Sequence, residues 1–203
     1  LLPGDVNSED VYKSYQAAMP TFAYEYGYAY IEEILLGVTE VARALNLDDE
    51  ATELIAEYDE RVAELSKRIV DADLADKPVS VVRYRGEGNF SIRFGTSEAI
   101  VFRALGMAQP EGQRNPDDFA VTVSLEQLNI LNEAHTVFLY VDDESGAAEI
   151  EALQDNPLWQ SLEPVKNNRL HPVDTGVWFN SDIPSLMGIM DDIERLFIEP
   201  SEA

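Results

Sequence analysis

The stretch that decides the fold is DDEATELIAEYDERVAELSKRIVD, residues 48–71. Its apolar residues recur at steps of three and four, which is the spacing of one face of an α-helix: Leu54, Ile55, Tyr58, Val62, Leu65 and Ile69. The acidic residues at 48–50 favour a helix start there, because the amino end of a helix carries partial positive charge. Such a helix spans about 36 Å at roughly 1.5 Å per residue. It is predicted to be either a strut between two lobes or a long helix packed along one edge.

The pattern changes to alternating strands and helices after a polar break that ends at Pro78. We predict strands at 79–84 (VSVVRY), 89–94, 136–141 (TVFLYV) and 169–173. We predict helices at 96–105, which Gly106 ends, and at 124–134, 156–162 and 183–197. Strands and helices that alternate at these lengths indicate an α/β fold with a parallel or mixed sheet covered on both faces.

The amino-terminal part reads as a helix (EDVYKSYQAAM), a short strand after Pro20 (TFAYEYG) and a second helix that ends near Leu45. The chain starts at Leu1 without an initiator Met, so we expect a mature or excised piece whose targeting sequence lies upstream. No apolar stretch reaches the length of about 18 residues that a membrane span needs, and no signal peptide is visible. Taken alone, that absence favours the cytoplasm.

Composition excludes several classes of function. The chain has 203 residues, 45% of them hydrophobic, and 14 Lys+Arg against 39 Asp+Glu. The formal net charge of -25 disfavours nucleic acid and anionic lipid surfaces as partners, because like charges repel. No cysteine is present, so disulfides and thiolate metal sites are excluded.

Catalytic motifs are absent from the sequence. The two histidines, His135 and His171, have no spacing typical of metal ligands. The Gly-Glu-Gly at 86–88 lacks the third glycine of a dinucleotide loop and precedes a strand rather than a helix. We therefore predict that the protein is not an enzyme, holds no protein-bound metal and carries no covalently bound cofactor.

Scarce positive charge gathers within residues 81–94: Arg83 and Arg85 lie at the end of the first strand after the break, and Arg93 lies in the next predicted strand. Ligands of α/β sheets bind outside the carboxyl ends of the strands. Strand alternation puts Arg83 and Arg85 on one side, where two guanidinium groups at ~7 Å repel by about 2 kcal/mol at an effective dielectric near 20. An anionic ligand would relieve that repulsion, and so would neighbouring acids such as Glu87 and Glu98.

Aromatic residues accompany these arginines, and a second aromatic pair lies in the polar stretch GVWFNSD before the last helix. A Trp-Phe pair in a turn of Gly, Asn, Ser and Asp is hard to explain by core packing, so we expect Trp178 to face a ligand. The predicted ligand-binding residues are Arg83, Tyr84, Arg85, Arg93, Trp178 and Phe179.

From the long helix onward, the order of features resembles the siderophore-binding class of bacterial ABC-transporter substrate-binding proteins. ATELIAEYDERVAELSKRI is similar to the helix that connects the two lobes in that class, and VSVVRYRG to the first strand of its carboxyl-terminal lobe. SLEQL followed by a buried strand, and NPLWQSLEPVKNNRLHPVDTGVWF, also resemble family segments. His135 departs from the family pattern, which usually has an acidic residue before the buried strand.

The resemblance implies a two-lobe substrate-binding fold with a single long connecting helix. Residues 1–46 would be the remnant of an amino-terminal lobe, 47–75 the connecting helix and 76–203 a nearly complete carboxyl-terminal α/β lobe. The family's amino-terminal lobe has further βα units before the segment that matches Leu1, so half of the binding cleft would lie outside this sequence. Glu126 matches the exposed acid with which that lobe docks onto the permease, although an ordinary first-turn acid explains it equally well.

The implied function is that of an extracytoplasmic protein, in the periplasm or on a lipid anchor, that delivers a ferric siderophore to an ABC importer. Its expected partners are an anionic iron-siderophore complex and the membrane permease, and it is expected to be a monomer. Two alternatives remain open at this point. The same fold could bind haem or a corrinoid, or the chain could be an acidic protein-interaction domain without a small-molecule ligand.

Overall fold

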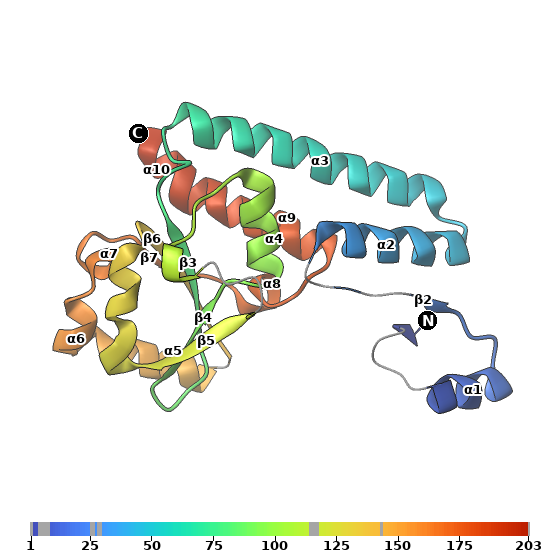
Figure 1. The fold of residues 1–203 in the computed structure, drawn as a ribbon, viewed down its shortest axis with the longest axis horizontal. Coiled ribbons are helices and arrows are strands. Elements are labelled where there is room, and N and C mark those ends of the chain that lie inside the picture. The colour runs from blue at the N-terminus through green and yellow to red at the C-terminus, as the bar shows by residue number, and fades with distance from the viewer. Residues whose placement is uncertain are drawn as a thin grey trace.

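The structure is a computed structural model and describes residues 2–3, 9–24, 27, 30–113, 118–142 and 144–202. A five-stranded sheet lies in its carboxyl-terminal part (Figure 1). The strands are β3 (Val79–Tyr84), β4 (Asn89–Arg93), β5 (Ala120–Ser124), β6 (Thr136–Val141) and β7 (Leu170–Pro172). They lie in the order β5-β4-β3-β6-β7; β3, β6 and β7 are parallel, and β4 runs antiparallel to both its neighbours.

Helices cover both faces of this sheet (Figure 1). On one face lie α3 (Asp48–Asp71), α4 (Ser97–Leu105), α8 (Thr175–Trp178) and α9 (Ile183–Ile193), followed by a π-helical turn, η4 (Glu194–Ile198), and α10 (Glu199–Glu202). On the other lie the 3-10 helix η2 (Leu125–Glu133), α5 (Glu144–Ala152), η3 (Leu153–Asp155), α6 (Pro157–Gln160) and α7 (Glu163–Lys166). The predicted α/β fold with a mixed, doubly covered sheet is therefore confirmed.

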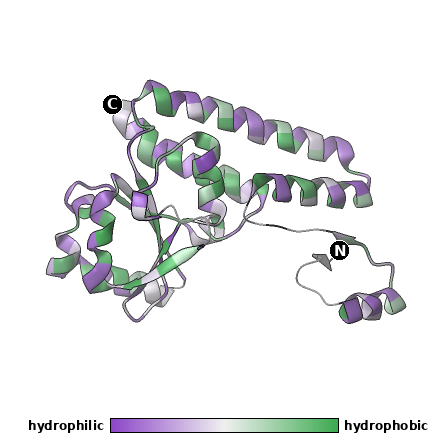
Figure 2. Ribbon diagram, in the orientation of Figure 1, coloured by the Kyte–Doolittle hydropathy of each residue, from purple (hydrophilic) through white to green (hydrophobic). Residues whose placement is uncertain are grey.

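Alternation along the strands builds two separate apolar cores. Val79 and Val81 of β3 pack with α3, α4 and α9, whereas Val82 of the same strand packs with η2 and α6. Figure 2 shows the corresponding apolar residues along the inner sides of the helices, with polar residues on their outer sides. Each face of the sheet has its own core. Whether a strand residue is odd or even in the alternation therefore decides on which face its side chain lies.

The long helix α3 has the predicted bounds and lies along one side of the molecule (Figure 1). Its buried residues are Ala51, Tyr58, Leu65 and Ile69. Beside its first half packs α2 (Ile31–Leu45), whose end at Asn46 adopts the left-handed conformation at φ 56°. The helix α1 (Glu9–Ala18) and the two-stranded pair of β1 (Leu2–Pro3) and β2 (Ala23–Tyr24) lie near the amino terminus.

Some local expectations are confirmed and others are wrong. Gly106 ends α4 in the left-handed conformation, and Asn156 caps α6 through Leu158 N–H, both as predicted. The segment after Ser124 forms a 3-10 helix instead of an α-helix, although the predicted cap is present, with Ser124 N–H donating to Gln127 Oε1 at 3.1 Å. The edge strand β5 was not predicted, because it is short, half exposed and preceded by a loop that contains the turn η1 (Glu111–Gln113).

An ion-pair network joins α3 to the carboxyl-terminal helix. The Glu194 carboxylate accepts hydrogen bonds from both Arg61 and Arg68, and Arg61 also donates to Asp191 Oδ1 at 2.8 Å. The bond from Arg61 is the main cause that lowers the pKa of Glu194 below its ordinary value. These bonds thereby join the second half of α3 to α9 and η4.

The variant Glu194→Gln is expected to lower the free energy of unfolding by about 1.5–3 kcal/mol at neutral pH, since two charge-assisted bonds are weakened. A carboxyl with a lowered folded-state pKa stabilises above its unfolded value and loses that contribution as the pH falls through the folded value. The difference from wild type should therefore shrink as the pH drops below 4.5, the ordinary value for this group. Urea unfolding across that range measures it.

The matched control is Asp71→Asn, which breaks the exposed i,i+4 pair with Lys67 on the same helix. Exposed pairs of this kind contribute about 0–1 kcal/mol, so this variant should unfold almost like wild type. Equal effects of the two substitutions would contradict a structural role for Glu194.

Candidate ligand-binding site

The strand register brings two of the predicted arginines to one face of the sheet. Arg83 of β3 pairs with Tyr140 of β6, and Arg93 of β4 pairs with Val81, two residues before Arg83. Residues two apart in a strand share a face, so Arg83, Arg93 and Tyr140 are neighbours on the side that α4 and α8 cover. We call these three residues, with Arg85 and Phe179, the rim.

Arg83 forms an ion pair with a carboxylate at the end of the neighbouring strand β6. Its Nε donates to Asp142 Oδ1 at 2.6 Å and its Nη2 to Asp142 Oδ2 at 2.8 Å, a two-bond fork. Asp142 directly follows β6 and is the main cause that raises the pKa of Arg83. The guanidinium carbon also lies 4.6 Å from the centre of the Phe179 ring, within the range of a cation–π contact.

Arg93 is paired with an acid that has no exposure to solvent. Its Nε donates to Glu98 Oε1 at 3.2 Å and its Nη2 to Thr96 Oγ1 at 2.8 Å. The Glu98 side chain, in the first turn of α4, is 0% exposed, and that of Arg93 is 14% exposed. Glu98 was one of the acids that the sequence suggested as a partner; Asp142 was not.

Tyr140 was missed by sequence reasoning because it lies inside the apolar run TVFLYV. Its hydroxyl is buried and has no hydrogen-bond partner within the described residues. Burial is the main cause that raises the pKa of Tyr140, and the charge of Glu98 adds to it. The hydroxyl is thus a neutral donor beside two arginines. Only the pairing of β3 with β6 shows that Tyr140 lies next to Arg83.

Arg85 differs from the other two arginines. It is exposed and makes no ion pair with any residue in the described ranges. It precedes the tight turn between β3 and β4, in which Gly86 and Gly88 take φ values of 83° and 74° that favour glycine. Among the described residues, Arg85 is therefore the rim arginine without a paired acid.

The two predicted aromatic contacts at Tyr84 and Trp178 are wrong for this structure. Tyr84 alternates to the face opposite Arg83, where its ring packs at 4.8 Å from Phe90. Its hydroxyl donates to the Glu149 carboxylate and accepts from Gly88 N–H at 2.9 Å. Tyr84 is therefore a core residue.

Trp178 is 0% exposed, and its indole lies 4.7 Å from the Phe138 ring and donates to Asp192 Oδ2 at 2.9 Å. The expected turn is the short helix α8, which Asp174 caps through Val177 N–H at 3.1 Å. That helix turns Trp178 into the core and leaves the next residue, Phe179, 48% exposed. Of the two aromatics in this predicted ligand-binding pair, Phe179 is therefore the exposed one.

Glu126, the predicted docking residue, is exposed in the first turn of η2. It accepts a hydrogen bond from Ser124 Oγ at 2.7 Å, and this bond is the main cause that lowers its pKa. The carboxylate is therefore charged and accessible at neutral pH.

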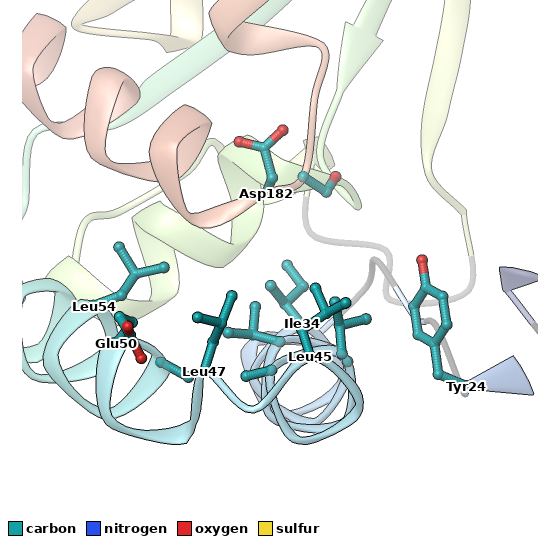
Figure 3. A pocket seen from close by; sticks show the side chains of 13 residues that line it. Tyr24, Ile34, Leu45, Leu47, Glu50, Leu54 and Asp182 are labelled. Atoms are coloured by element: carbon teal, nitrogen blue, oxygen red, sulfur yellow. The ribbon is translucent and has the colours of Figure 1, made fainter. Parts of the chain in front are cut away.

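An apolar groove of about 360 Å³ lies away from the rim, between α2, the start of α3 and the segment before α9. Figure 3 shows Ile34 and Leu45 of α2 on one side of it, with Asp182 facing them from across the groove. None of the predicted ligand-binding residues lines it. It is therefore a feature separate from the rim.

The described residues show neither a metal-binding cluster nor a membrane-spanning helix. They contain no group of three or more His, Asp or Glu side chains placed to hold a metal ion. Within those same ranges, no helix combines the length and apolar character needed to cross a bilayer. The rim consists of arginines, a buried hydroxyl and an exposed ring. Its hydrogen-bond donors suit oxygen-rich ligands.

Comparison with protein-family models matches residues 2–174 to the family described as periplasmic binding protein. The chain belongs to the periplasmic binding protein family. This match covers most of the chain and contains the long helix and the rim, apart from Phe179. The family consists of binding proteins, which agrees with the prediction that the chain is not an enzyme.

Two curated relatives from Bacillus subtilis (strain 168) are similar to this family member. One is the probable siderophore-binding lipoprotein YfiY, 28% identical over 98% of this chain and 63% of the relative. The other is the Fe(3+)-citrate-binding protein YfmC, 25% identical over 84% of this chain and 51% of the relative. The chain spans less than two thirds of the length of both relatives.

Solved structures of periplasmic binding proteins share the fold. The iron-uptake system-binding protein FeuA of Bacillus subtilis matches with a TM-score of 0.77 and 20% identity over 96% of this chain and 70% of that one. Staphylococcus aureus SirA complexed with staphyloferrin B matches with a TM-score of 0.75 and 20% identity over 96% and 69%. At this identity the likeness concerns the fold alone.

Proposed function

We propose that the full-length protein binds a ferric siderophore outside the cytoplasm and delivers it to an ABC importer. The observation that carries this proposal is the family match over residues 2–174, together with relatives whose names state siderophore, iron or ferric-citrate binding. The relative YfiY is named a lipoprotein, which supports a place on the outer side of the membrane for this protein too.

The rim provides groups that suit the oxygen atoms of such a cargo. Arg85 offers a guanidinium without an ion pair in the described residues, and Phe179 offers an exposed ring beside Arg83. Arg83 uses its Nε and Nη2 for Asp142, and within the described residues its Nη1 has no acceptor, so Nη1 can donate to a ligand. Tyr140 would add its hydroxyl if the site opened to admit the cargo.

The division into lobes is part of the same proposal. Residues 1–46 would be the remnant of an amino-terminal lobe, and residues 47–75 would form the helix that connects the two lobes. Residues 76–203 would form the carboxyl-terminal lobe, with the rim facing the cleft. The fastening of α3 to Glu194 supports a connecting helix that moves with the second lobe. The exposed carboxylate of Glu126 would dock on the permease, and the carrier would act as a monomer.

The structure weakens one reason for expecting an anionic cargo. The sequence favoured an anionic complex because three arginines stood together without assigned partners. In the structure Asp142 and Glu98 neutralise two of them, Arg83 and Arg93. The case for an anionic cargo then depends on Arg85 alone within the described residues.

Calorimetric titration of the full-length protein with ferric siderophores, haem and a corrinoid tests the proposal. We expect a ferric siderophore to bind, and Arg85→Ala to weaken that binding about tenfold or more, since a charge-assisted hydrogen bond contributes about 1.5–3 kcal/mol. Lys166→Ala is the control, because it removes an exposed positive charge on α7, just before β7 starts at the opposite edge of the sheet. Binding of haem or a corrinoid in place of any ferric siderophore would overturn the proposal.

A further inference from the structure

Acids pair with two of the three arginines of the rim. Asp142 pairs with Arg83 through a two-bond fork, and the fully buried Glu98 pairs with Arg93. The third arginine, Arg85, is exposed and makes no ion pair within the described residues. The two pairs therefore leave one rim guanidinium instead of three without a counter-charge among the described residues, in a chain whose formal net charge is -25.

The two ion pairs are built into the fold. Asp142 follows Tyr140 by two positions, so the register that places Tyr140 beside Arg83 also brings Asp142 to the same face. Glu98 sits in the first turn of α4, where the partial positive charge of the helix end also favours a carboxylate. The fold therefore holds both acids beside their arginines.

We infer that Asp142 and Glu98 set the charge selectivity of the rim, and that the cargo is a ferric complex of low net charge, of the hydroxamate type. This inference rests on the proposed function and names its substrate class. A neutral Arg–carboxylate pair still donates hydrogen bonds to carbonyl and hydroxamate oxygens from its free edge. A triply negative tris-catecholate complex meets a carboxylate beside each of two guanidinium groups and gains little net attraction.

The remaining contacts of the rim agree with a cargo of this kind. Phe179 presents an exposed ring beside Arg83, which suits the apolar spacers that link hydroxamate groups. The Tyr140 hydroxyl is neutral, and its pKa is raised, so it can donate a hydrogen bond without contributing charge.

The test compares two probes on the full-length protein: an uncharged ferric tris-hydroxamate and a triply negative ferric tris-catecholate. Wild type is expected to bind the tris-hydroxamate more tightly. Asp142→Asn frees Arg83 of its counter-charge, so it should raise the affinity for the tris-catecholate about tenfold and change that for the tris-hydroxamate by less than about threefold. Calorimetric titration at two salt concentrations measures both affinities.

Two control variants separate this effect from a general change in charge or fold. Asp142→Glu keeps a carboxylate beside Arg83 and should keep the selectivity of wild type. Asp76→Asn removes one exposed negative charge just before β3 starts, at the opposite edge of the sheet, and should leave both affinities unchanged.

The possible results distinguish this inference from the proposed function. Preference of wild type for the tris-catecholate, or an unchanged tris-catecholate affinity in Asp142→Asn, overturns the charge selectivity while siderophore binding stands. Failure of wild type to bind any ferric complex overturns the proposed function, and the inference with it.

Discussion

Replacing Trp178 by alanine is expected to lower the free energy of unfolding by about 3–5 kcal/mol, the usual cost of removing a buried tryptophan. The side chain has no exposure, packs 4.7 Å from the Phe138 ring and donates to Asp192. The substitution leaves a large cavity on the α9 side of the sheet and removes the indole hydrogen bond. Chemical unfolding monitored by circular dichroism measures the effect.

The matched control is the adjacent residue. Phe179→Ala removes a ring that is 48% exposed, so it should change the unfolding free energy by less than about 1 kcal/mol. If Trp178→Ala instead left stability unchanged and abolished ligand binding, the assignment of Trp178 to the core would be refuted. The pair of variants therefore decides which of the two neighbouring aromatics belongs to the core and which to the rim.

The second large effect on stability is expected at Glu98, the buried acid that pairs with Arg93. Glu98→Gln leaves the guanidinium of Arg93 without its counter-charge in a site with little access to water. Breaking a buried ion pair by removing one partner typically costs about 3–5 kcal/mol. Urea unfolding at neutral pH should show a loss of this size, whereas Glu163→Gln, at an exposed pair with Lys166, should show almost none.

A double-mutant cycle shows whether the pair acts as a unit. Arg93→Gln/Glu98→Gln removes both charges, so its cost should be smaller than the sum of the two single costs by about 1–3 kcal/mol. Strict additivity would mean that the two side chains do not interact, and that Glu98 is buried for another reason.

Much of the fold could be predicted because its signals are local. The periodicity of residues 48–71 predicted α3 with the observed bounds, and the apolar run 136–141 predicted β6. Gly106 and the N-cap Asn156 also lie where expected. In contrast, β5 and the helix α8 were missed, because a short edge strand and a single helical turn have weak sequence patterns.

The candidate site was harder to predict, because its composition depends on contacts between distant segments. The sequence drew attention to Arg83, Arg85 and Phe179, which stay part of the proposed site. It did not reveal Tyr140 inside its apolar run, and it placed Trp178 in a turn facing a ligand. Only the helical conformation of α8 shows that the first aromatic of the pair turns inward and the second outward.

By itself, the sequence determined the acidity of this protein, the absence of cysteine chemistry, the long helix and the alternation of strands and helices after Pro78. These features follow from composition and from periodicity within single segments. The tertiary structure decided which arginines keep an uncompensated charge. Arg83 and Asp142 are 59 residues apart and meet because β3 and β6 pair in one particular register, which alternation within either strand alone does not specify.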